Sequence, residues 1–308
     1  MRKVSVILSV YKPNKKFLIK QLKSIDKQTY ENIELLINDD CPNDRCDKTI
    51  FEKTLKKVKY RFLKYQKDNL GYTKSFERLV NNVKHDGYIA FCDQDDIWMK
   101  NKIKYMVNSL KKTNKELAIC DRQIIDKNDI IVCNSVEKSR KGLLSTWTSG
   151  KEIATRTPFI TIAPGMSIIC TTKFAKEHLP YSPYAFDKWL TCCAAFENKL
   201  FHVKKPLVKY RRHGNNVSGQ LIGINSKKDY YKNRVTVHNS LVETLSEKYK
   251  SSNINIKDMV NFSNARMKKN IFKIFKYGYL SPMQAKYEIL LAITPNFIFK
   301  LLLSIRRR

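Results

Sequence analysis

The most informative stretch of this chain is Tyr88-Ile89-Ala90-Phe91-Cys92-Asp93-Gln94-Asp95-Asp96-Ile97-Trp98. Residues 88–92 have the length and composition of a buried strand, and three carboxylates follow within four residues. Clustered carboxylates repel one another, so such a cluster at a strand end indicates a bound cation. Asp93 and Asp95 suit Mg²⁺ or Mn²⁺ held jointly with substrate phosphates. The alternative is a solvated acidic turn in which Asp96 caps a following helix.

Short apolar segments of the same kind occur earlier in the chain. Strands are predicted at 4–10, 33–37 and 60–65, and between them apolar residues recur every three or four positions, as in helices. This alternation predicts an α/β fold in which helices cover a parallel sheet. Ligands of such sheets bind at the carboxyl ends of the strands. Tyr11 and the pair Asp39 and Asp40 are therefore expected beside the acidic cluster.

The character of the chain changes after Gly219. Residues 116–219 mix short strands with one clear helix at 186–198, whereas helical patterns run through 226–250, 257–277 and 282–305. Residues 226–308 hold seventeen Lys or Arg against five acids. We expect a catalytic domain over 1–219 and a basic helical region over 220–308.

Composition excludes several other classes of protein. With 308 residues and 43% apolar side chains, the chain is neither a disulfide-held miniprotein nor a disordered one. The first apolar run is too short for a signal peptide, which favours the cytoplasm and eight reduced cysteines. No Cys-x-x-Cys pair is present, so a zinc site is not expected. The net charge of +31 calls for an anionic partner.

The nucleotide-binding signatures with a glycine-rich loop are absent, so any nucleotide is held in another way. Five ordered blocks of the chain instead resemble glycosyltransferase family 2. They are Val4-Ser5-Val6-Ile7-Leu8-Ser9-Val10-Tyr11, Gln28-Thr29-Tyr30-Glu31-Asn32-Ile33-Glu34, Asn38-Asp39-Asp40, Asn69-Leu70-Gly71 and Asp93-Gln94-Asp95-Asp96-Ile97-Trp98. The resemblance is strongest over residues 3–106.

This resemblance implies the A-type glycosyltransferase fold, a Rossmann-like mixed sheet with helices on both faces. It further implies a nucleotide-diphosphate sugar donor, a divalent metal and inversion at the anomeric carbon. By position, Ser9 and Tyr11 resemble residues that flank the nucleoside, and Asp40 resembles the carboxylate that contacts the base edge. Asp95 matches the metal-binding aspartate of the family's Asp-x-Asp motif, and Asp93 is the first aspartate of that motif, beside the nucleotide and the metal.

Further candidates complete the predicted site. Lys74, near a helix N-terminus, is a second cation for the diphosphate. Asp187 resembles the family's general base, although an aspartate at a helix start also serves as an N-cap. Arg211 and Arg212 are candidates for diphosphate or acceptor binding. His213 is a candidate for the same binding role and also for a metal ligand. These three belong to the loop 210–219, which resembles a loop of enzymes that build bacterial surface polysaccharide, rhamnosyltransferase-like ones included.

An anionic membrane surface explains the charge better than nucleic acid, because the lysines are spread along the chain and no nucleic-acid recognition module is visible. The apolar segment 289–305 is interrupted by Pro295, Asn296 and Lys300, so we expect it to lie in the membrane interface and not to span. A helix packed on the catalytic body is the alternative.

The sequence thus predicts an inverting sugar transferase that acts on a lipid-linked glycan at the inner membrane face. A metal-dependent nucleotidyltransferase and a non-catalytic nucleic-acid or polysaccharide-binding module are the rival hypotheses.

Overall fold

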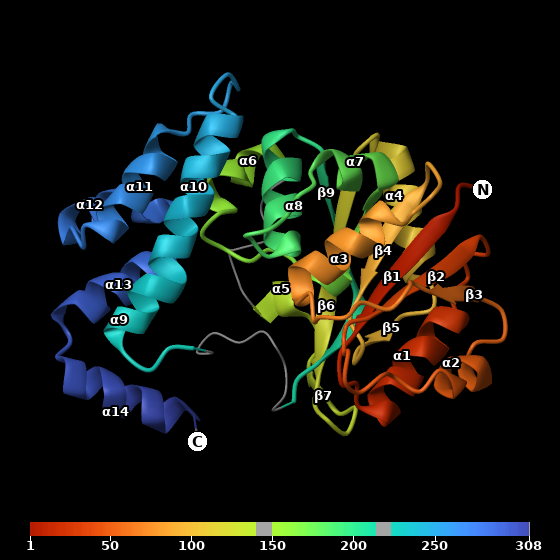
Figure 1. Cartoon of the computed structure of the whole chain (residues 1–308). Coiled ribbons are helices and arrows are strands. Elements are labelled where there is room, and N and C mark those ends of the chain that lie inside the picture. The colour runs from red at the N-terminus through yellow and green to blue at the C-terminus, as the bar shows by residue number, and fades with distance from the viewer. Residues whose placement is uncertain (140–149, 214–222, 308) are drawn as a thin grey trace. The chain divides into compact units, whose positions relative to one another are not determined.

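The computed structural model describes residues 1–139, 150–213 and 223–307. The chain divides into two compact units (Figure 1). Unit 1 comprises Met1–Gly150 and Ile162–Gly214, and unit 2 comprises Lys151–Thr161 and Asn215–Arg308. The predicted domain boundary at 219 falls outside the described residues and stays a prediction.

Within the described residues, unit 1 contains one mixed sheet of nine strands in the order β3-β2-β1-β4-β8-β6-β9-β5, with β7 beside β6. The strands are β1 (Val4–Val10), β2 (Ile33–Asp39), β3 (Lys59–Phe62), β4 (Tyr88–Cys92), β5 (Ile97–Trp98), β6 (Leu117–Ile125), β7 (Ile131–Cys133), β8 (Ile168–Thr171) and β9 (Leu200–Arg211). The first four strands are parallel, and β8 runs antiparallel to β4 and β6.

Helices cover both faces of this sheet. They are α1 (Lys15–Asp26), α2 (Thr49–Thr54), α3 (Tyr72–Asn81), α4 (Lys102–Thr113), α5 (Val136–Ser139), the 3₁₀ turn η2 (Gly165–Ser167), α7 (Thr172–Glu177) and α8 (Phe186–Phe196). The α1 and α4 side chains pack with the even-numbered residues of β1 and β4 in one core. Phe76 of α3 and Phe186 of α8 instead pack against Phe91, which points to the opposite face.

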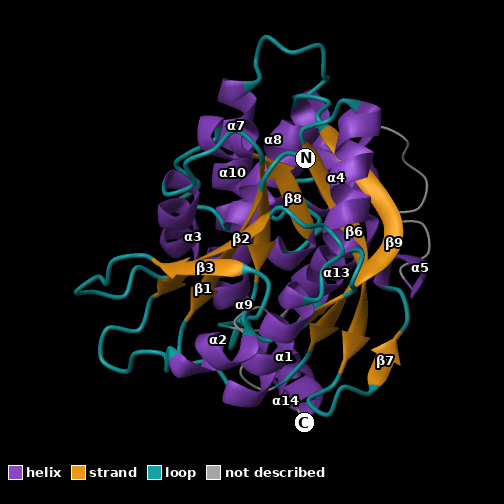
Figure 2. Ribbon diagram, turned by 90° about the vertical axis from the view of Figure 1, so that its right-hand side faces the viewer, coloured by secondary structure: helices purple, strands orange, loops and turns teal. Residues whose placement is uncertain are grey.

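The long strand β9 carries its end back toward the acidic cluster. Its pairing with β6 shifts register at Asp121, and the strand curves strongly (Figure 2). Farther along, Lys209 pairs with Ile97 of β5. A register shift of this kind bends a strand and redirects the side chains that follow it. The end of β9 therefore lies beside the loop that follows β4.

Unit 2 is helical. After α6 (Gly150–Ile153), which begins in unit 1, its elements are the 3₁₀ turn η1 (Ala154–Arg156), α9 (Lys227–Tyr230), the π-helical segment η3 (Tyr231–Val235), α10 (Thr236–Lys248), α11 (Lys257–Met267), α12 (Ile271–Tyr277), the 3₁₀ turn η4 (Gly278–Leu280), α13 (Pro282–Ile293) and α14 (Asn296–Arg307). Arg266 of α11 and Glu288 of α13 form an ion pair with no exposed side-chain surface. Tyr230 donates a further hydrogen bond of 2.7 Å to Glu288.

The structure confirms the predicted strands 4–10 and 88–92 at both ends. The strand predicted at 60–65 is shorter and ends at Phe62. The alternative in which Asp96 caps a helix is wrong, because Ile97–Trp98 forms strand β5 and the next helix begins at Lys102. Sequence patterns also gave no sign that Lys151–Thr161 belongs with the helical unit, where Phe159 packs against Phe262.

Candidate active site

Three parallel strands end together at one edge of the sheet. Val10 of β1 is level with Asp39 of β2, and Leu8 is level with Cys92 of β4. The amide of Gln94 then pairs with the backbone of Tyr11, accepting from its N–H at 2.9 Å and donating to its carbonyl at 3.0 Å. The residues after β1 and β4 are therefore joined at the place where ligands bind in such sheets.

Two aspartates of the acidic cluster sit in strongly perturbed surroundings. Burial and the charges of Asp95 and Asp187 raise the pKa of Asp93 to about 7. Asp96 is fully buried and accepts a hydrogen bond of 2.8 Å from the backbone N–H of Arg211. Burial, with the neighbouring Asp95 and Asp93, raises the pKa of Asp96 well above its usual range. Strongly perturbed carboxyl groups of this kind are concentrated at functional sites.

Asp95 and His213 come together although they are far apart in sequence. The Nε2 atom of His213 lies 2.8 Å from Oδ2 of Asp95. The His213 ring packs near the ring of Phe17, with 5.4 Å between centroids. The curvature of β9 places His213 here, because that strand ends at Arg211.

This pair has the chemistry of a divalent-metal site. Carboxylate oxygen and imidazole nitrogen are both ligands for Mn²⁺, and a diphosphate commonly supplies further oxygens. No group of three or more His, Cys, Asp or Glu side chains in the described parts of the chain is arranged to hold a metal ion. Of the three predicted metal ligands, the structure thus pairs Asp95 with His213, and a ligand role for each of the three stays a prediction.

Asp187 reaches the same region from α8. Phe186, the residue before it, stacks on Phe91 of β4 with 4.6 Å between ring centroids and 17° between ring planes. A Cβ atom on Gly165 would lie only 2.4 Å from the Phe186 ring, so glycine permits this close approach. The charge of Asp187 accordingly acts on Asp93. This juxtaposition was not predictable from local sequence.

The local contacts of Asp187 differ from those of an N-cap. The N-cap of α8 is Ala185, so Asp187 lies within the first turn, where its Oδ1 accepts the N–H of Lys188 at 2.7 Å. The N–H of Gly165 also bonds to this carboxylate. Burial raises the pKa of Asp187 above its ordinary value, which makes it a stronger base when ionised.

On the predicted nucleoside side, the Tyr11 side chain is accessible, whereas Ser9 and Asp40 have hydrogen-bond partners within the chain. The Ser9 hydroxyl lies 2.6 Å from that of Ser75, while Tyr11 is 48% exposed. Asp40 is buried, and its carboxylate accepts the N–H groups of Leu70 and Gly71 at 2.9 Å each. These bonds secure the turn before α3, where Gly71 has a φ of +77° that favours glycine. A base-edge role for Asp40 therefore stays a prediction.

The three predicted cations have different environments. Lys74 is exposed in the first turn of α3, and Arg212 is exposed after β9. Arg211 is fully buried, and its guanidinium donates to the carbonyls of Asp95 at 2.8 Å and Asp126 at 3.0 Å. It also forms an ion pair of 2.6 Å with Asp129. These contacts make Arg211 a group that positions Asp95. The remainder of the predicted loop, 214–219, lies outside the described residues.

Sequence reasoning missed Lys102. This side chain has no exposed surface, and its Nζ atom lies 3.2 Å from the ring centroid of Trp98. Burial lowers its pKa to about 8, against the opposing influence of Cys120, Cys92 and the aspartates 96 and 93. Lys102 thus supplies positive charge beneath the acidic cluster. Its only signal in the sequence is a position four residues after Trp98.

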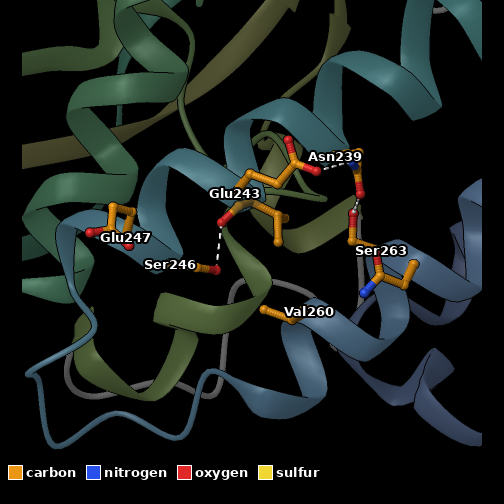
Figure 3. A pocket seen from close by; sticks show the side chains of 8 residues that line it. Asn239, Glu243, Ser246, Glu247, Val260 and Ser263 are labelled. Atoms are coloured by element: carbon orange, nitrogen blue, oxygen red, sulfur yellow. Dashed lines mark hydrogen bonds between the residues drawn. The ribbon is translucent and has the colours of Figure 1, made fainter.

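A separate cavity of about 280 Å³ lies in unit 2 between α10 and α11 (Figure 3). Its lining includes Glu243, Ser246, Val260 and Ser263. Asn239 donates a hydrogen bond to Glu243 within α10 and accepts one from Ser263 of α11, which links the two helices. None of the predicted site residues lines this cavity. We therefore place the candidate active site at the strand ends of unit 1.

Solved structures share this fold. TarS of S. aureus, in complex with UDP-GlcNAc, matches with a TM-score of 0.55 at 17% identity, covering 93% of this chain and 84% of that one. The mannosyltransferase PcManGT of Pyrobaculum calidifontis, in complex with GDP-Man and Mn²⁺, matches with a TM-score of 0.53 at 12% identity, covering 99% and 80%. The fold is thus the A-type glycosyltransferase fold, as predicted.

Sequence comparison agrees with this fold. Residues 5–147 match the family model of glycosyl transferase family 2, in line with the resemblance of the five sequence blocks. A curated relative is the UDP-Glc:alpha-D-GlcNAc-diphosphoundecaprenol beta-1,3-glucosyltransferase WfgD of Escherichia coli, 30% identical over 129 residues. That match covers 42% of this chain and 49% of WfgD, so the chain spans about half the length of this relative.

Proposed function

We propose that this chain is an inverting glycosyltransferase that moves a sugar from a nucleotide-diphosphate sugar to a hydroxyl of a lipid-linked or polysaccharide acceptor. The product would belong to a bacterial cell-surface glycan. The observation that carries this proposal is the convergence of Asp93, the Asp95–His213 pair and Asp187 at one end of the sheet. Relatives support the substrate classes, since WfgD is named for a diphosphoundecaprenol acceptor and TarS was solved with UDP-GlcNAc.

The proposed reaction is a single displacement at the anomeric carbon. The acceptor oxygen attacks the face opposite the diphosphate, a new carbon–oxygen bond forms, and the bond to the diphosphate breaks. Asp187 takes the hydroxyl proton as attack proceeds, and burial of its carboxyl group suits this role. The sugar therefore arrives on its acceptor with inverted configuration.

The leaving group carries the developing negative charge. Asp95 and His213 would hold a divalent cation, and bound Mg²⁺ or Mn²⁺ would offset the charge on the diphosphate. Lys74 lies exposed at the start of α3, where it supplies a further cation. Arg211 keeps Asp95 in position through its bond to that residue's carbonyl oxygen.

The proposed place of action is the inner face of the cell membrane, where a lipid-linked acceptor meets a cytoplasmic donor. No helix in the described part of the chain is long and apolar enough to cross a membrane. The basic residues of unit 2 supply attraction to anionic headgroups, at about 1 kcal/mol for each cation near the surface.

The test is a panel of sugar nucleotides assayed with Mg²⁺ or Mn²⁺ for donor hydrolysis and for transfer to lipid-linked acceptors. Asp187→Asn should reduce transfer about 10²- to 10⁴-fold, as expected for loss of a general base, while donor binding is retained. Asp95→Asn should remove the metal-dependent part of turnover. Glu177→Gln, an exposed carboxylate in α7, is the matched control and should retain full activity.

The pH dependence gives a second measurement. Because Asp187 must be ionised to accept a proton, transfer should rise with pH through its raised pKa and be lost in acid. Undiminished transfer by Asp187→Asn, or no turnover with any donor in the panel, would contradict the proposed function.

A further inference from the structure

Several large apolar side chains of the carboxyl-terminal helices are exposed to solvent. Phe272 of α12 is 88% exposed and Phe275 is 79% exposed, although phenylalanine is usually buried. Four more exposed apolar side chains follow in α13 and α14. We call the whole set the apolar rim: Phe272, Phe275, Met283, Leu290, Ile293 and Phe297.

Within α12 and α13 the rim residues follow the helical period. In α13 the exposed residues Met283, Leu290 and Ile293 lie along one side, while Ala285 and Leu291 are buried on the other. In α12 the exposed Phe272 and Phe275 are three residues apart, and Ile274 is buried. Each helix thus already buries one apolar face and exposes a second. An additional apolar face of this kind marks a surface that another phase or molecule covers.

The charges of the last fifty residues are almost all of one sign. Residues 259–308 contain ten Lys or Arg and a single acid, Glu288. Glu288 has no exposed side-chain surface and is paired with Arg266. Lys273, Lys276, Lys286 and Lys300 are exposed within the same helices as the rim. The described surface of this segment therefore shows cations without exposed carboxylates.

We infer that the apolar rim inserts into the interface of an anionic lipid membrane, with the four lysines on the headgroups. Cations interleaved with aromatic and aliphatic side chains, in helices that do not span, are characteristic of interfacial helices. An acidic soluble partner would satisfy the lysines but would leave no apolar phase for the two phenylalanines. The inference rests on the proposed membrane-linked acceptor and names the surface that meets the membrane.

The test uses the full chain and vesicles of phosphatidylglycerol mixed with phosphatidylcholine, or of phosphatidylcholine alone. The full chain should float with the anionic vesicles. The double variant Phe272→Asn/Phe275→Asn should bind them at least about tenfold more weakly, because two insertable rings are lost. The matched control is Ile130→Asn/Val132→Asn, which changes two apolar residues of unit 1 that are 63% and 69% exposed and should bind normally.

A tryptophan reporter separates insertion from adsorption. Phe275→Trp should shift its emission to shorter wavelength when anionic vesicles are added, because the indole enters an apolar phase. Binding that salt abolishes, without an emission shift and without a phenylalanine effect, would overturn insertion. A second result would also overturn insertion: the native chain does not bind vesicles but forms a dimer, and the double phenylalanine variant is monomeric. The apolar rim would then be the contact with a second copy of the chain.

Donor hydrolysis in the absence of vesicles, measured on the same preparations, keeps the two proposals distinct. Donor hydrolysis without vesicle binding would refute only the membrane insertion of the apolar rim. Vesicle binding without turnover of any donor would refute only the proposed activity.

Discussion

Replacing Arg211 by methionine should destabilise unit 1, whereas the same change at the adjacent Arg212 should not. Arg211 is fully buried and Arg212 is exposed, so the pair is a matched comparison within one strand end. The substitution removes the guanidinium contacts to Asp129 at 2.6 Å and to the carbonyls of Asp95 and Asp126. Methionine retains part of the packing against Phe17, over which the guanidinium lies at 4.3 Å.

The magnitude follows from these contacts. Hydrogen bonds to a charged group contribute about 1.5–3 kcal/mol each, and the gain is partly offset because a buried guanidinium must lose its hydration. The Asp129 side chain is 32% exposed, so water can solvate it again once its partner is gone. We therefore expect a net loss of about 3 kcal/mol for Arg211→Met, and less than about 0.5 kcal/mol for Arg212→Met.

Urea unfolding followed by tryptophan fluorescence measures this difference, since Trp98 and Trp189 both belong to unit 1. With a denaturant slope of about 3 kcal/mol per molar, the midpoint of Arg211→Met should fall by about 1 M. Arg211→Lys should fall between the two, because an ammonium group cannot reproduce the planar fork. Equal midpoints for the Arg211 and Arg212 variants, with a raised donor KM for Arg211→Met, would refute the positioning role and restore direct diphosphate binding.

Two further predictions concern buried charge elsewhere. Burial lowers the pKa of His202 from 6.5 to about 4. Between these two pH values, the unfolded chain therefore binds a proton at His202 and the folded chain does not. Stability should thus fall as pH falls through this window, by up to about 3 kcal/mol, and thermal melts of His202→Gln should show a flatter pH dependence than those of the native chain. Glu288→Gln should lower the free energy of unfolding of unit 2 by about 3–5 kcal/mol, because it leaves the Arg266 charge buried without its partner. An unchanged thermal unfolding transition, followed by circular dichroism of the helices, would contradict this prediction.

Local patterns in the sequence were sufficient to predict the central strands and to locate the candidate site at their ends. Strands β1, β2 and β4 are buried on both faces, so each appears as a short, mainly apolar segment that is recognisable without any knowledge of its neighbours. The polar residues at their ends mark the binding edge, because parallel strands place those ends together. Asp93, Asp95 and the candidate metal were identified in this way, and the family resemblance added Asp187.

The partners of those residues depend on contacts between distant parts of the chain. Whether Asp96 capped a helix or bonded to the backbone of Arg211 depended on β5 and on its pairing with β9. The two arginines 211 and 212 are alike in sequence, and only the end of β9 buries one and exposes the other.

The same limit applies to the two pairs that define the site. His213 meets Asp95 across 118 positions, and Phe186 meets Phe91 across 95, because a register shift bends β9 and a glycine admits α8. Spacing along the chain reports contacts within one helix or strand. Tertiary packing alone determines which strand ends and helix starts face each other, since that choice minimises buried unpaired charge and empty volume over the whole fold.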